Sequence, residues 1–87
     1  MTDTQLLQEC EALAERLGIR VSRENLAGGP GGLCTFKGES RFILDYRLDV
    51  TSQIELFSRE FGRLPIEDIY VVPKLRDQID TYREVQI

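Results

Sequence analysis

Few side chains in this 87-residue sequence are suited to chemistry, because it contains two cysteines and no histidine. Without histidine, Ser-His-Asp and Cys-His catalysis, histidine general bases and zinc sites that use imidazole are excluded. Cys10 and Cys34 do not have the spacing of a C-x-x-C metal or redox motif. We therefore predict two reduced, partly buried thiols, no catalytic residue and no metal or other cofactor.

Two further features could bind a ligand. Asp45 and Asp49 are close enough in sequence to hold Mg²⁺ or to act as an acid and a base, but both flank a predicted helix start, where aspartate usually caps. The glycine-rich segment Gly28–Gly32 could surround a phosphate with backbone amides. It lacks the lysine and hydroxyl residue of a P-loop, and no helix follows directly. We interpret it as a connecting loop, with a ligand-binding loop as the alternative.

The segment from about Leu33 to Leu64 carries a more specific pattern. A strand with Ile43-Leu44-Asp45 leads through a short turn into a helix that contains Arg59-Glu60-Phe61-Gly62-Arg63. This resembles the core of IrrE/ImmA-type zinc metallopeptidase domains, in which a strand with a hydrophobic-Asp pair precedes a helix bearing H-E-[LF]-G-H. The segment Gly31–Cys34 is also similar to a Gly-Gly-Leu-Cys strand in small bacterial proteins of unknown function, which implies no activity.

The sequence departs from that family at both metal ligands, because Arg59 and Arg63 stand where the family has histidine. Two imidazoles four residues apart on a helix bind one Zn²⁺, and the intervening Glu activates water. Arginine stays protonated and has no free lone pair for a metal. The zinc site and the peptidase activity that the resemblance implies are therefore not expected in this chain.

The arginines suggest two alternatives. In one, Arg59 and Arg63 replace the metal electrostatically and tie two helices together by pairing with carboxylates: Glu60, Asp77, Asp80 and Glu84. In the other, both arginines lie on a solvated face and stabilise the protein little. The candidate binding residues, which could meet an anion or an acidic partner, are Arg41, Arg47, Arg59, Glu60 and Arg63.

The hydrophobic spacing predicts the elements that position these residues. A stripe of Leu6, Cys10, Leu13 and Leu17 indicates a first helix, capped by Asp3 or Thr4 and ended by Gly18. The alternating residues 19–23 are typical of a half-buried strand. Residues 33–37 and 41–46 predict a hairpin around a turn at 38–40. Because residues 42–44 are all apolar, the second hairpin strand should lie inside the sheet or beneath a helix.

Two more helices follow. The stripe Ile54, Phe57, Phe61 and Leu64 predicts a helix from about Asp49 to Arg63, which Asp49 or Thr51 caps and Pro65 stops. Residues 66–72 predict a turn and a brief extended stretch. Pro73 begins a third helix with Leu75, Ile79 and Tyr82 on one face, and residues 84–87 continue it or fray. These elements predict one α+β domain over residues 1–87, with a three-stranded antiparallel sheet (a strand plus a β-hairpin) and about three helices packed on it.

Composition narrows the function. The net charge of −4 disfavours non-specific nucleic-acid binding, and no apolar run is long enough to cross a membrane. The N-terminus has no signal-peptide pattern, so we expect a cytoplasmic protein. We predict a small soluble non-enzymatic domain that acts through protein–protein contacts with an unknown partner and forms a homodimer. The alternatives are a minimal hydrolase or metal-binding remnant that uses carboxylates and thiols, and a small-anion binding module.

Overall fold

Helices and strands form in the order expected, within residues 1–29 and 31–85, the part of the chain that the computed structural model describes. The α+β class is therefore confirmed. Residues 86 and 87 of the predicted tail lie outside the described residues. The elements are α1 (Asp3–Arg16), β1 (Arg20–Glu24), β2 (Gly31–Phe36), β3 (Glu39–Asp45), α2 (Val50–Phe61) and α3 (Pro73–Val85).

The sheet is mixed, so the prediction of a purely antiparallel sheet is wrong. Its strand order is β1-β3-β2, with β1 parallel to β3 and β2 antiparallel to β3. The apolar run Phe42–Leu44 explains this order, because a central strand pairs on both sides and is better covered than an edge strand. This strand was predicted to lie inside the sheet or beneath a helix, and it does both. The segment after β1 carries the chain past β3 to the β2 edge.

The hairpin turn is shorter than predicted. Lys37 and Gly38 alone connect β2 to β3, with φ angles of 52° and 79°. Two successive positive φ angles are the signature of a type I′ turn, whose twist matches that of the strands. Glu39 and Ser40, which we expected in the turn, are the first residues of β3.

The helix ends agree with most of the sequence expectations. Asp49 caps α2 by accepting a hydrogen bond from Ser52 N at 2.7 Å, and Pro73 begins α3, both as predicted. The cap of α1 is Thr2 instead of Asp3 or Thr4, and it forms a reciprocal capping box with Gln5. Residues 66–72 contain the predicted turn, followed by backbone that belongs to no strand.

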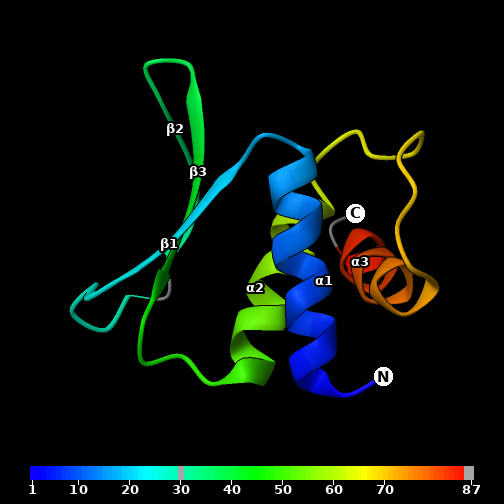
Figure 1. The fold of residues 1–87 in the computed structure, drawn as a ribbon, viewed down its shortest axis with the longest axis horizontal. Coiled ribbons are helices and arrows are strands. Elements are labelled where there is room, and N and C mark those ends of the chain that lie inside the picture. The colour runs from blue at the N-terminus through cyan, green and yellow to red at the C-terminus, as the bar shows by residue number, and fades with distance from the viewer. Residues whose placement is uncertain (30, 86–87) are drawn as a thin grey trace.

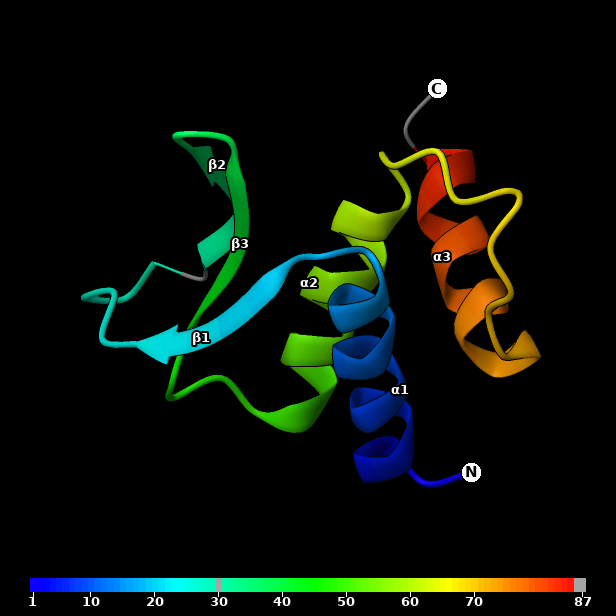
Figure 2. The same cartoon turned by 45° about the horizontal axis from the view of Figure 1, so that its top comes forward.

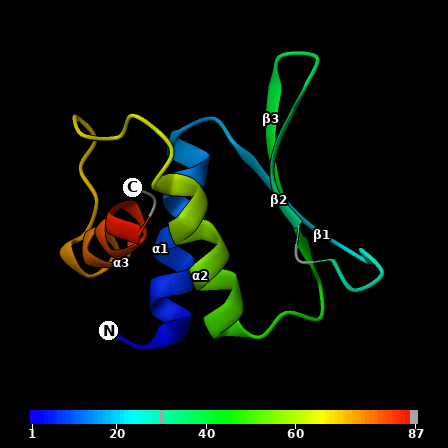
Figure 3. The ribbon, with the colours of Figure 1, turned by 180° about the vertical axis from the view of Figure 1, so that it is seen from behind.

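The molecule is layered, with α1 and α2 side by side between the sheet and α3 (Figures 1 and 2). Phe42 of β3 meets Phe57 and Phe61 of α2, with ring centroids 4.5 and 5.7 Å away. The helices therefore cover one face of the sheet, which we call the inner face. The opposite, outer face carries no helix, and the β2–β3 turn stands clear of the helices (Figure 3). None of the helices within residues 1–29 and 31–85 is long and apolar enough to span a membrane.

Candidate functional site

Arg59, Glu60 and Arg63 lie together on the C-terminal half of α2 and just after it, but their contacts are weak. The Arg63 guanidinium is 3.9 Å from the Glu60 carboxylate, and 61% of the Arg63 side chain is exposed. Arg59 lies over the ring of Tyr82 from α3, 5.9 Å from its centroid. Among the described side chains, neither arginine pairs with Asp77 or Asp80, and the side chain of Glu84 lies outside them. The contact between α2 and α3 at this point is thus a cation–π contact.

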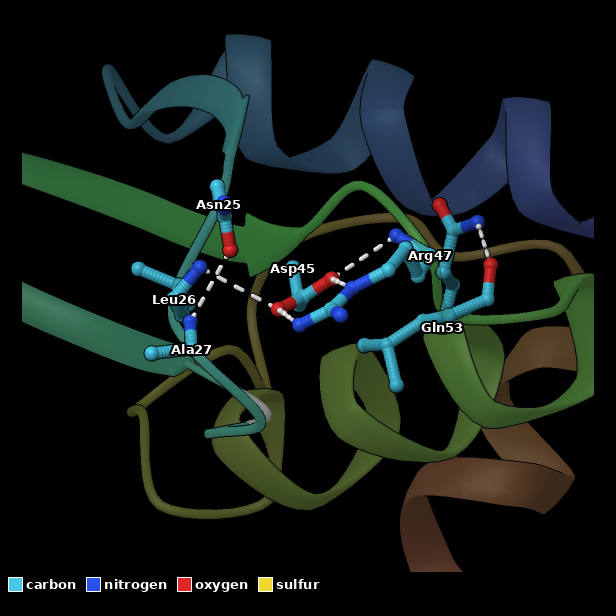
Figure 4. A network of polar contacts seen from close by, with 7 residues as sticks. Asn25, Leu26, Ala27, Asp45, Arg47 and Gln53 are labelled. Atoms are coloured by element: carbon cyan, nitrogen blue, oxygen red, sulfur yellow. Dashed lines mark hydrogen bonds and ion pairs between the residues drawn. The ribbon is translucent and has the colours of Figure 1, made fainter.

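The strongest polar site is the ion pair between Asp45, at the end of β3, and Arg47 (Figure 4). The buried Asp45 carboxylate accepts two hydrogen bonds from the Arg47 guanidinium, both 3.1 Å long. It also accepts the backbone N–H of Arg47 at 2.8 Å and that of Leu26 at 3.1 Å. One carboxylate therefore joins β3 to the start of the glycine-rich loop.

These contacts fix the ionisation of Asp45. The Arg47 side chain, then the N–H groups of Arg47 and Leu26, hold the pKa of the Asp45 carboxyl well below its usual range. The hydrogen bonds from Ser52 lower the pKa of Asp49 in the same way. An open hollow of about 350 Å³ beside the pair is lined by Gly28, Gly29, Asp45, Arg47 and Leu48. Asp45 is thus held by Arg47 and Asp49 by the start of α2, so each carboxylate has a structural role.

The two thiols differ more than the sequence suggested. Cys10 is fully buried in α1, and burial raises the pKa of its thiol to about 12. Cys34 lies in β2 and is exposed, so the prediction that both are partly buried is wrong. Both are free thiols, and among residues 1–29 and 31–85 no three cysteine or acidic side chains are placed to hold a metal ion.

The outer face of the sheet carries a second hollow, of about 370 Å³. Its lining residues alternate with the buried Phe42 and Leu44 and come from β2 and β3: Cys34, Phe36, Glu39, Arg41 and Ile43. Phe36 is 73% exposed, although large apolar side chains usually find cover. Glu39 is 3.8 Å from Arg41 and 3.6 Å from Arg20 of β1. We call this site the outer-face hollow.

The candidate arginines do not converge. Arg41 lies on the outer face beside Glu39, whereas Arg47 is held by Asp45 at the end of β3. Arg59 and Arg63 contact Tyr82 and Glu60 on the helical side of the molecule. Of the five predicted residues, only Arg41 lies in the outer-face hollow. Phe36 was not predicted as a site residue, and its signal was an aromatic side chain at the end of an uncharged strand.

Three arginines that the sequence analysis did not single out hold the irregular segment after α2. Arg83 donates to the carbonyls of Gly62 and Leu64 at 3.2 and 2.9 Å. Arg76 donates to the carbonyls of Ile66 and Ile69, and Arg16 to that of Tyr70. These bonds are structural, because each ends on a backbone oxygen. No spacing rule could have found them, since their partners are carbonyl groups that every residue has.

Comparison with protein-family models, curated proteins and solved structures found no match for this chain. The resemblance to IrrE/ImmA-type domains therefore stays a prediction. What the chain does has to be argued from its own residues.

Proposed function

We propose that this chain is a small non-enzymatic binding module that recognises a segment of another protein in the outer-face hollow. One observation carries the proposal: two arginines share a single carboxylate beside a largely exposed phenylalanine. Arg20, beside the hollow, and Arg41, within it, both contact Glu39, so two positive charges share one carboxylate there. Apolar surface with an excess of charge beside it is typical of a binding site.

The chemistry of the hollow indicates its partner. Phe36 and Ile43 supply apolar surface, and the excess guanidinium charge attracts a carboxylate. The fitting ligand is a protein segment with one large apolar side chain next to an aspartate or glutamate. The net charge of −4 repels acidic segments from the rest of the surface, so it directs them to the cationic hollow.

The absence of histidine and the bound state of Asp45 support a non-enzymatic role. Cys34 is exposed but has no histidine anywhere in the chain to hold its thiolate. A cytoplasmic location belongs to the same proposal, because a reducing compartment keeps an exposed thiol free.

Selection of random peptides on the immobilised protein tests this function. We expect the enriched peptides to carry an aromatic or aliphatic residue next to a carboxylate. Their affinity, measured by fluorescence polarisation, should fall at least about tenfold in Phe36→Ser and in Arg41→Glu, as for the loss of one central contact. Tyr70→Ser is the matched control, because Tyr70 is an equally exposed aromatic in the segment between α2 and α3. Peptides without acidic residues, or binding that neither variant weakens, would refute the proposal.

A further inference from the structure

The edge of β2 that faces away from β3 is open. In the described sheet β3 pairs with one side of β2, and no strand pairs with its other side. Cys34, Thr35 and Phe36 are all exposed. Such an edge presents unpaired N–H and C=O groups that can pair with another extended chain.

The turn geometry shows which groups are open. In a two-residue type I′ hairpin, the residues that flank the turn form a hydrogen-bonded pair, here Phe36 and Glu39. Hydrogen-bonded and non-hydrogen-bonded pairs alternate along an antiparallel ladder. The pairs of Leu33 with Phe42 and of Thr35 with Ser40 are therefore the non-bonded ones. The backbone N–H and C=O groups of Leu33 and Thr35 point to the open edge.

The two edges of the sheet differ in protection. The other edge strand, β1, carries Arg20, Arg23 and Glu24 among its five residues. Charged side chains of this kind discourage strand pairing. The β2 strand has the sequence Gly-Gly-Leu-Cys-Thr-Phe, with no charge and no proline. Of the two edges, only the β2 edge is therefore suited to pairing with another strand. Because β2 has no charge, a strand that is also uncharged is the expected partner.

We infer that the β2 edge pairs antiparallel with the β2 edge of a second copy of this chain, around a two-fold axis at Cys34. Gly31 and Gly32 pair with Leu44 and Ile43 of β3 but have positive φ angles of 98° and 154°, so the part of β2 with ordinary strand backbone begins at Leu33. Centring the pair on Cys34 places Leu33 opposite Thr35 of the second copy, and both pairs use their open groups. Phe36 then lies opposite Gly32 of the second copy, a residue without a side chain of its own.

The result is a continuous six-stranded sheet with two outer-face hollows. A pairing of so few residues buries much less than the roughly 800 Å² per partner of a stable complex. The dimer is therefore weak and exchanges rapidly. The inference does not rest on the proposed function, because it uses the backbone of an edge and not the outer-face hollow.

Sedimentation equilibrium tests the pairing. We expect the average mass to approach twice that of the monomer at about 1 mM chain and to return to the monomer at about 10 μM. Thr35→Val keeps the open N–H and should dimerise like the wild type. Thr35→Pro removes an N–H that β3 does not use, and should stay monomeric with an unchanged circular dichroism spectrum. A wild type that is monomeric at 1 mM, or a Thr35→Pro variant that dimerises equally, would overturn the inference.

Cross-linking of the wild type reads the register without relying on a proline variant. In a non-hydrogen-bonded antiparallel pair the Cα atoms are about 4.5 Å apart, within the range of a disulfide. Diamide, which takes up the two hydrogens as two thiols join, should link the two Cys34 residues within minutes. Cys10→Ser should cross-link equally, since Cys10 is buried, and Cys34→Ser should not. Absence of a Cys34-linked dimer at about 1 mM would refute this register. Peptide binding by a monomeric protein would leave the proposed function standing.

Discussion

A single carboxylate, that of Asp45, organises the point where β3 ends and the glycine-rich loop begins. It is buried, yet it accepts hydrogen bonds from the Arg47 side chain and from two backbone N–H groups. Buried charges are tolerated when they are paired in this way. Asp45 is therefore a structural residue of the sheet, and the main role of Arg47 is to pair with it.

The pH dependence of stability should follow from this site. The pKa of Asp45 in the folded protein lies below the value of about 3.9 in the unfolded chain. Its stabilising contribution is therefore fully present above that value and is lost as the pH falls toward the folded pKa. We expect Asp45→Asn to lower the Tm by several degrees at pH 7, and this difference to shrink below about pH 4. Thermal unfolding from pH 7 to 2.5 measures both, with the exposed Asp68→Asn as a control that should match the wild type.

Residue types alone showed what this chain cannot do more clearly than what it does. The missing histidines excluded the catalytic and metal sites that use imidazole. Of the two aspartates predicted to cap a helix, Asp49 does so, whereas Asp45 accepts hydrogen bonds from Arg47 and Leu26 instead. The roles of Arg41 and Arg47 depend on Glu39 and Asp45, which only the folded sheet places beside them. Phe36 was missed because the exposure of an aromatic side chain depends on which face of the sheet the helices cover.

At the scale of elements, the segment between α2 and α3 is held by arginines from the helices. It has turns but no helix or strand, so its carbonyl groups need partners from elsewhere. Arg83 and Arg76 of α3 and Arg16 of α1 supply them. These contacts allow a short irregular connection to place α3 against α2.

Replacing Arg83 should therefore destabilise the protein more than replacing Arg63. Arg83→Met removes two charge-assisted hydrogen bonds, to Gly62 and Leu64, and an ion pair with the exposed Glu67, and should cost about 2 kcal/mol of unfolding free energy. Arg63→Met removes a long, exposed ion pair and should cost less than about 0.5 kcal/mol. Urea denaturation of the two variants compares them directly. Equal stabilities would contradict the structural role of Arg83.

The spacing of apolar residues predicted the three helices, because a buried stripe along a helix can be recognised within one segment of the sequence. Leu6, Cys10 and Leu13 are buried as expected, and so are Ile54, Phe57 and Phe61. The pairing order of the strands was not predictable in this way. Whether β2 or β3 lies next to β1 depends on burial across the whole sheet, and the sequence of a single segment does not contain this information.

At the scale of the molecule, the close approach of two backbones fixes how β2 lies on β3. Gly31 has a φ of 98°, and a Cβ at this position would collide with the carbonyl group of Ile43. Gly28 has a similar φ of 93°, but open space surrounds it. Substitutions at these two glycines therefore distinguish the cost of a left-handed backbone, which both share, from the cost of a steric collision, which only Gly31 has.

We expect Gly28→Ala to cost about 1 kcal/mol, from the left-handed backbone alone. Gly31→Ala adds the collision with Ile43 and should destabilise the whole domain by several times as much. Chemical denaturation gives both free energies, and near-ultraviolet circular dichroism shows whether tertiary packing survives. Similar losses for the two variants would mean that β2 can shift away from β3 at little cost.

The parallel contact of β1 with β3 also orders the events of folding. β2 meets β3 through a turn of two residues, so this hairpin can close quickly, whereas Arg20 must find Arg41 across a much longer stretch of chain. We therefore expect the hairpin to nucleate the sheet and β1 to join last, when α1 docks. Pulse-labelled hydrogen exchange should protect the amides of β3 that bond to β2 before those of β1. In a nascent chain β1 is made before β2 and β3, so it waits longest for its partner, and its charged side chains discourage mispairing during that time.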